Sequence, residues 1–184
     1  MRHNMRNDLI KMRGWTEMMC EESDPERRAE QFETVARVLD RWETITEKME
    51  QIQQVLEFMQ GQWVTKEAGP LVETAVTPVR EANPEAAITT DLLDEESVQV
   101  PATLLEAVRE LTENAVAATT NPSVEVGLAS PDDGWVEVGV RDDGPGLLEM
   151  ETSVLETGEE TPLSHGQGLG LWMVQMIVTQ AGGE

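Results

Sequence analysis

Glu110 and Asn114 lie four residues apart in a predicted helix, so their side chains point in the same direction. A carboxylate can polarise a water or a hydroxyl group, and an amide oxygen is a hard ligand that suits Mg²⁺. Both positions lie off the apolar side of that helix. Taken alone, this pair is more typical of two solvated helix residues than of a site.

Two further segments are rich in glycine. Asp142 follows a predicted strand and precedes Gly144 and Gly146, which let a ligand approach the backbone, and a fixed carboxylate can accept a hydrogen bond from an adenine amino group. Residues 166–170 precede an apolar helix, whose first N–H groups can bind phosphate. This segment is neither a Walker loop nor a Rossmann fingerprint. Each turn alone is more often simply a turn, but the three segments together supply most of a nucleotide site.

The first 60 residues have the periodicity of two helices, over residues 2 to about 20 and 26 to 60. The second contains no Gly or Pro, spans roughly 50 Å, and follows Asp24, a good N-cap, and Pro25, a good first residue. Its apolar positions recur at steps of three and four: Phe32, Val35, Leu39, Trp42, Ile45, Met49, Ile52, Leu56 and Met59. The first helix has a matching apolar side: Met5, Leu9, Met12 and Met19. Two such helices make half a bundle, so we expect a hairpin that forms a dimeric four-helix bundle with a second copy.

The pattern changes after Gly61. We expect helices over 71–82, 101–119 and 169–180, and strands over 87–90, 98–100, 124–128 and 136–140. The last two strands flank the turn Ser130–Gly134 and are predicted to form a hairpin, and Gly182 and Gly183 are predicted to stop the final helix. This half is predicted to be an α+β sandwich with helices on one face of a sheet. The predicted domains are therefore 1–63, a helical hairpin, and 64–184.

Charge and composition restrict the class of protein. The chain has 36 Asp and Glu against 13 Lys and Arg, a net charge of -23, and the acidic residues are scattered rather than gathered in a tail. Such a surface excludes nucleic acid and an anionic membrane face as partners. It is typical of proteins from salt-accumulating halophiles, or simply of an acidic mesophilic domain. Cys20 is the single cysteine, and we expect a soluble chain of a reducing compartment, the cytoplasm, with no membrane segment or signal peptide.

The order of the three segments resembles the N, G1 and G2 boxes of the GHKL ATP-binding fold, over about residues 66–184. The segment Arg2–Leu9, which contains His3, looks like the phosphoacceptor H box of sensor histidine kinases, particularly the archaeal halophile-type variant. The helical hairpin is similar to the dimerisation and histidine-phosphotransfer domain of that family. The resemblance therefore implies a helical hairpin followed by an α+β sandwich of the GHKL ATPase type.

The resemblance also implies roles for single residues. His3 would accept the γ-phosphoryl group of ATP, and Asn114 would bind Mg²⁺ between the phosphates. Glu110 would hold a water on the metal or assist deprotonation. Asn7, one turn after His3, matches the position that relatives use to orient water when they dephosphorylate their partner. That partner would be a response regulator, whose aspartate receives the phosphoryl group.

The same resemblance assigns nucleotide binding to the two glycine segments. Asp142 would bind adenine, with Gly144 and Gly146 beside it. The resemblance implies that the remaining predicted ligand-binding residues would shape the phosphate loop and the ATP lid: Gly166, Gly168, Leu169 and Gly170.

The sequence departs from the family pattern at several points. Asn4 follows the acceptor where many relatives have an acid, and Ala117 stands where many have a lysine. No phenylalanine lies between Gly146 and Gly166, and the segment 156–162 is expected to form the lid instead. The H box begins directly after Met1, and relatives continue beyond Glu184 into further strands, so we expect a chain cut at both ends.

Two other functions stay open. A catalytically impaired pseudokinase or scaffold would dimerise and bind ATP or a regulator without turnover, and Asn4 and Ala117 favour it. A hydrolase of the gyrase or chaperone type would use Glu110, but it gives no reason for His3 or for the helical hairpin.

Overall fold

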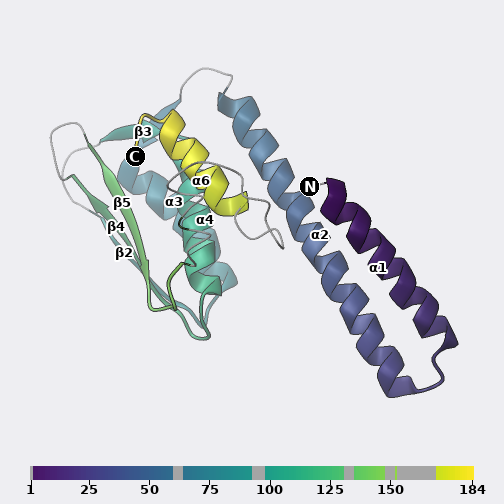
Figure 1. Cartoon of the computed structure of the whole chain (residues 1–184). Coiled ribbons are helices and arrows are strands. Elements are labelled where there is room, and N and C mark those ends of the chain that lie inside the picture. Colours follow the sequence, from purple (N-terminus) through teal and green to yellow (C-terminus); the bar gives the residue numbers. More distant parts are fainter. Residues whose placement is uncertain (1, 60–63, 93–97, 131–134, 148–151, 153–168) are drawn as a thin grey trace. The chain divides into compact units, whose positions relative to one another are not determined.

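The computed structural model describes residues 2–59, 64–92, 98–130, 135–147, 152 and 169–184 (Figure 1). The described residues fall into two compact units. The first ends at Gln51 and contains helix α1 (Arg2–Glu21) and most of helix α2 (Pro25–Met59). The second begins at Ile52, near the end of α2, and contains the remaining elements.

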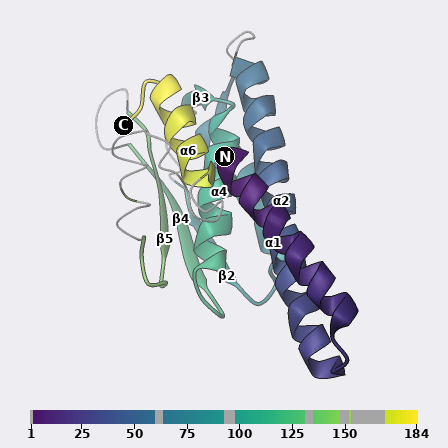
Figure 2. The same cartoon turned by 45° about the vertical axis from the view of Figure 1, so that its right-hand side comes forward.

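Helices α1 and α2 form the predicted hairpin and lie side by side in both views (Figures 1 and 2). The α2 helix begins as expected, because the Asp24 carboxylate accepts a hydrogen bond of 2.9 Å from the Glu26 N–H and Pro25 has no N–H that would need an acceptor. Trp15 and Trp42 are half-buried in this unit, and Ile45 is buried.

A polar contact fixes the two helices to each other. The Asp8 carboxylate of α1 forms an ion pair with Arg41 of α2 and accepts a hydrogen bond of 3.2 Å from the Trp42 indole. The Asp8 and Arg41 side chains are largely shielded from solvent, so breaking the pair would leave a charge in a partly apolar surrounding. This contact defines the register of the hairpin five residues after His3.

The hairpin also leaves a set of large apolar side chains exposed. Each of them keeps about half or more of its surface in solvent: Met5, Leu9, Ile10, Met18, Phe32, Leu39 and Met49. An apolar surface of this extent on two helices is typical of a face that packs against another helical pair.

The described strands of the second unit form two small sheets. One has the strand order β2-β4-β5, in which β2 runs parallel to β4 and β4 runs antiparallel to β5, with Val126 opposite Val140. Its strands are β2 (Ala87–Asp91), β4 (Ser123–Ala129) and β5 (Glu137–Asp142). The other pairs β1 (Thr65–Glu67) with β3 (Gln99–Pro101) in antiparallel fashion.

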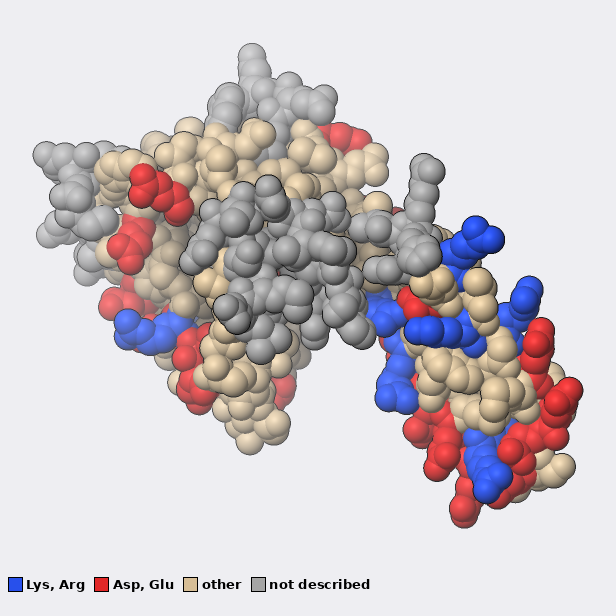
Figure 3. Space-filling model, viewed as in Figure 1, with Lys and Arg blue, Asp and Glu red and all other residues tan. Residues whose placement is uncertain are grey.

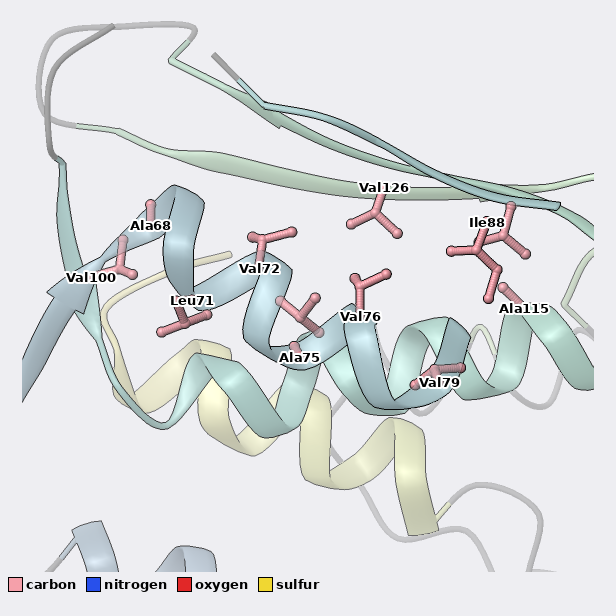
Figure 4. Packing of buried hydrophobic residues seen from close by; sticks show 12 residues of the cluster. Ala68, Leu71, Val72, Ala75, Val76, Val79, Ile88, Val100, Ala115 and Val126 are labelled. Atoms are coloured by element: carbon pink, nitrogen blue, oxygen red, sulfur yellow. The ribbon is translucent and has the colours of Figure 1, made fainter. Parts of the chain in front are cut away.

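The described residues of the unit also form helices α3 (Ala68–Ala82), α4 (Leu104–Ala117) and α6 (Leu169–Gln180). Helices α3 and α4 cover one face of the larger sheet. Figure 4 shows Val72 and Val76 of α3 directed at that sheet, where Val126 and Ile88 face them; three of these four side chains are fully buried. A second cluster joins the end of α2, α4 and α6 through Val55, Ala107 and the α6 residues Met173, Val174 and Ile177.

The acidic side chains are distributed as the sequence predicted. Figure 3 shows Asp and Glu on the visible surface of both units, interspersed with basic side chains on the hairpin. Within the part of the chain that the structure describes, no helix is both long enough and apolar enough to cross a bilayer.

Most predicted elements are confirmed. Helices α1, α2 and α6, strand β2 and the β4–β5 hairpin all form within about two residues of the expected bounds. The final helix ends at two glycines as expected: Gly182 has a φ of +79°, and the Gly183 N–H donates to the Val178 carbonyl at 2.9 Å. Most of the predicted turn between β4 and β5 lies outside the described residues.

Two boundaries and one strand differ from the prediction. Pro101 does not open α4 but ends β3, where it pairs with Thr65, and the next N–H, that of Ala102, donates to the Val64 carbonyl. Helix α3 begins three residues before Leu71, because Pro70 sits in the first turn, where its missing N–H costs nothing. Strand β1 was not predicted, since three exposed polar residues carry no strand pattern.

Candidate functional site

The candidate site is organised by one side of α4. Glu110, Asn114 and Ala118, the C-cap residue, recur every four residues and therefore share a face, with about 6 Å between successive positions. The outer two positions make close contacts with the two glycine segments.

The first contact joins Glu110 to the start of α6. A Cβ atom added to Gly170 would lie 1.8 Å from Glu110 Oε1 and 2.5 Å from Cδ, so the carboxylate packs directly on the glycine backbone. The Glu110 side chain is 4% exposed, and the prediction that it lies off the buried side of α4 was wrong. The reason is that α4 is covered twice: Val108 and Ala115 face the main core, while Ala107 and Leu111 face α6.

The second contact joins the end of α4 to the turn after β5. A Cβ atom at Gly144 would lie 2.7 Å from the Ala118 Cβ and 2.7 Å from Asp142 Oδ1. The turn is closed by the Gly144 N–H, which donates to Asp142 Oδ1 at 2.8 Å. The neighbouring Asp143 carboxylate instead accepts a hydrogen bond of 3.0 Å from the Ser123 N–H.

Glycine is required in this turn for two different reasons. At position 144 a side chain has no room, whereas at position 146 the backbone has a φ of +80°, a conformation that residues with a Cβ adopt only at a cost. The two positions that the sequence marked as glycines beside a ligand are therefore also fixed by the fold.

Asn114 lies between these contacts, one helical turn from each, and is exposed. The Asp142 carboxylate is exposed as well and uses Oδ1 in its own turn. The first turn of α6 contains no acidic residue of its own, so its N–H groups favour a negative charge supplied from elsewhere. An exposed amide, an exposed carboxylate and a helix N-terminus thus border one stretch of α4.

The structure describes the other predicted site residues only in part. Leu169 begins α6 and is buried, which gives it a packing role, and Gly166 and Gly168 lie outside the described residues. His3 belongs to α1, but its side chain is not among those described. Asn7 is exposed one turn later. Both belong to the first unit, whereas the residues of the nucleotide site belong to the second.

The described residues contain no group of three or more acidic, histidine or cysteine side chains that would hold a metal by themselves. An open hollow of about 210 Å³ lies on the larger sheet, where Gly127 pairs with Gly139 two positions along the ladder from the pair of Glu125 with Arg141. None of the predicted site residues lines it.

Sequence reasoning did not foresee the two packing contacts. The signals were present, because Ala118 is a small residue one turn after Asn114, and Gly170 is the second residue of a helix that otherwise needs no glycine. A contact between segments 60 or 26 residues apart cannot be read from either segment alone.

A family model matches part of the second unit. Residues 99–184 match the family model described as "Histidine kinase-, DNA gyrase B-, and HSP90-like ATPase". No curated protein sequence matches the chain.

Several solved structures share the fold. A mycobacterial sensor histidine kinase, MprB, is 22% identical with a TM-score of 0.53, and the match covers 66% of this chain and 81% of that one. The Acinetobacter baumannii histidine kinase AdeS is 16% identical with a TM-score of 0.54 over 97% of this chain and 86% of that one.

The histidine kinase ThkA, in a complex with the response regulator protein TrrA, has a TM-score of 0.63 at 20% identity. That match covers 99% of this chain but 53% of the ThkA chain, so the present chain spans about half of it. The chain thus has the fold that the sequence predicted, a helical N-terminal region followed by an α/β domain, and residues 99–184 of that domain match the ATPase family model.

The contact between Gly144 and Ala118 gives a test of the site's packing. We expect Gly144→Ala to lower the free energy of unfolding by about 1–3 kcal/mol, because the new methyl group overlaps Ala118 and the Asp142 carboxylate. Urea unfolding followed by circular dichroism measures this. The matched control is Gly139→Ala, where a Cβ meets nothing within 4 Å. Equal stability of the two variants would contradict the close packing of the turn on α4.

Proposed function

We propose that this chain is the catalytic core of a sensor histidine kinase, which transfers the γ-phosphoryl group of ATP to His3 and then to an aspartate of a response regulator. The observation that carries the proposal is the α4 face, on which Asn114 lies between the Gly144 turn and the Gly170 end of α6. The match of residues 99–184 to the ATPase family supports it.

The nucleotide would lie across this face. Asp142, exposed at the end of β5, would accept a hydrogen bond from the adenine amino group with the carboxylate oxygen that its own turn leaves unused. Gly144 and Gly146 would let the adenine approach the backbone. Gly166, Gly168, Leu169 and Gly170 would shape the loop that binds the phosphates at the start of α6.

Asn114 would hold Mg²⁺, and the residues present fit that ion. A single exposed amide oxygen is a suitable donor, because Mg²⁺ keeps several waters and takes its other oxygens from phosphates rather than from a cage of side chains. When bound, the ion would neutralise part of the negative charge of the phosphates. Glu110 is assigned by the family resemblance to hold a water or to assist deprotonation.

His3 would be the nucleophile. The unprotonated nitrogen of a neutral imidazole would attack the γ-phosphorus. A nitrogen–phosphorus bond would form as the bond to the bridging oxygen of ADP breaks, and the proton on the other ring nitrogen would pass to solvent water. Asn7, exposed one turn later on α1, would orient the water that removes the phosphoryl group from the regulator. The working domains would be 1–63 for phosphotransfer and 64–184 for ATP binding.

Two protein partners follow from this proposal. A second copy of the chain would cover the exposed apolar side of α1 and α2 in a four-helix bundle. A response regulator would receive the phosphoryl group; ThkA is a relative whose structure contains such a partner. We place the reaction in the cytoplasm, where ATP is available.

A net charge of -23 suits function at high salt, as in an archaeal halophile-type kinase, because salt screens the repulsion between carboxylates. Assays of this chain therefore belong in concentrated KCl as well as in ordinary buffer.

A pseudokinase or scaffold is the second candidate. Ala117 in place of a lysine and Asn4 in place of an acid favour it, because both would weaken the transfer step more than dimerisation. Binding of ATP without transfer of label would select this function.

The first prediction from the proposed function concerns the phosphoryl acceptor, His3. With γ-labelled ATP and Mg²⁺ in high KCl, we expect acid-labile label on the wild-type chain and a loss of at least about a hundredfold in His3→Ala and Asn114→Ala. His165→Ala is the matched control, since His3 and His165 are the two histidines of the chain, and it should keep its label. Equal labelling of all four proteins would refute the proposal.

The second prediction separates two neighbouring carboxylates. Asp142→Asn keeps an oxygen for the Gly144 N–H but offers only NH₂, a donor, to adenine, so ADP affinity should fall about ten- to a hundredfold. Asp143→Asn keeps the acceptor for Ser123 and should bind as the wild type does. Titration calorimetry with Mg-ADP measures both. A larger loss in Asp143→Asn would reverse the assignment.

The third prediction concerns assembly. Light scattering after gel filtration should give twice the chain mass for the wild type. Leu39→Glu, which places a charge on the exposed apolar side of α2, should give a monomer at the same concentration. Thr44→Glu places the same charge at an exposed polar position of α2 and should leave the dimer intact. A monomeric wild type would rule out the bundle.

A further inference from the structure

We propose that Glu110 is a positioning residue, which fixes the start of α6, and with it the end of the glycine segment 166–170, to the helix that carries Asn114. The contact between Glu110 and Gly170 is independent of the proposed function. Its consequence for nucleotide binding rests on the proposed function. The positioning role differs from the role in water activation or deprotonation that the family resemblance assigns to Glu110.

The first argument is the geometry of the contact. Glu110 Oε1, Cδ and Cγ would lie 1.8, 2.5 and 3.1 Å from a Cβ on Gly170, so most of the side chain lies along this one residue. Gly170 is itself buried and is the second residue of α6. Glycine is disfavoured inside a helix, and here its presence is explained by the carboxylate that occupies the place of a side chain.

The second argument is charge. Glu110 is 4% exposed, and a buried carboxylate is stable only where it is hydrogen-bonded or lies in a positive field. The first turn of α6 provides that field through N–H groups that have no acceptor within the helix, and it has no acidic residue of its own. Glu110 therefore supplies from α4 the negative charge that a helix usually takes from its own first turn.

The third argument is the surrounding packing. Ala107 lies one turn before Glu110 on α4 and is buried in the same cluster as Met173 and Ile177 of α6. The apolar contacts hold the two helices together but resist sliding along their axes weakly, because dispersion contacts are not directional. The carboxylate adds a directional contact at the start of α6, where the glycine segment ends.

The consequence concerns the distance between two parts of the site. Asn114 is one turn after Glu110 on α4, so the metal-binding amide and the end of the phosphate loop are related through this contact. A change that moves α6 relative to α4 would change the spacing of metal and phosphates. Glu110 is then needed for nucleotide affinity as well as for any step of the reaction.

The test is a double-mutant cycle in the full chain, read by Mg-ADP affinity, since ADP reports binding without chemistry. Glu110→Gln keeps the shape and an acceptor oxygen and should bind within about threefold of wild type, whereas Glu110→Ala should lose about tenfold. Gly170→Ala should lose at least as much, because its methyl group meets the carboxylate. The double variant Glu110→Ala, Gly170→Ala should bind about as well as Glu110→Ala alone.

Gly139→Ala, which meets nothing within 4 Å, is the matched glycine control and should have the same small effect in both backgrounds. The proposal is overturned if all Glu110 variants bind ADP like the wild type while Glu110→Gln loses label transfer at saturating ATP, the result expected of a base. It is equally overturned if the effects of Gly170→Ala and Glu110→Ala simply add.

Failure of the proposed function is distinguishable from failure of this inference. If the wild-type chain binds no Mg-ADP, the proposed function fails, and the same cycle is then read by thermal unfolding. Gly170→Ala should lower the unfolding midpoint in the wild-type background and have little effect in the Glu110→Ala background. A midpoint shift of the same size in both backgrounds would show that the contact between Glu110 and Gly170 does not position α6.

Discussion

The second unit depends on the close approach of two backbone segments to one helix. Gly170 meets the Glu110 carboxylate and Gly144 meets the Ala118 methyl group, and neither position has space for a Cβ. The strand that ends at Asp142 and the helix that begins at Leu169 are thereby brought to opposite ends of one face of α4. Because protein interiors are closely packed, such contacts transmit small displacements instead of absorbing them.

Helix α4 can make both contacts because it is buried on two sides. Val108 and Ala115 belong to the core between α3 and the sheet, while Ala107 belongs to the cluster with α6. A helix held in this way cannot rotate to relieve a clash at either end, so the polar strip between its two apolar sides keeps a fixed direction. Asn114 lies in that strip, and its orientation follows from packing at positions that never touch a ligand.

The elements were largely predictable from sequence and the site only in part. Helix α2 has a strong N-cap at Asp24 and an unbroken apolar period, so both its type and its bounds were determined locally. Pro101 was assigned to a helix because it suits a first turn, yet pairing with Thr65 competes for the same residue and cannot be seen in the local pattern. The burial of Glu110 was missed for the same reason, since its partner Gly170 is 60 residues away.

The distribution of charge places a further demand on the proposed site. Between Asp142 and Gly170 the sequence contains no lysine or arginine, and Ala117 offers none from α4. The buried Glu110 carboxylate already occupies part of the positive field at the start of α6. A bound triphosphate would therefore be neutralised by a divalent cation and by backbone N–H groups rather than by side chains. In the proposed site, the position of Asn114 would therefore affect affinity more strongly than it would beside a lysine, and the two glycine contacts relate the start of α6 and the turn after β5 to the helix that carries Asn114.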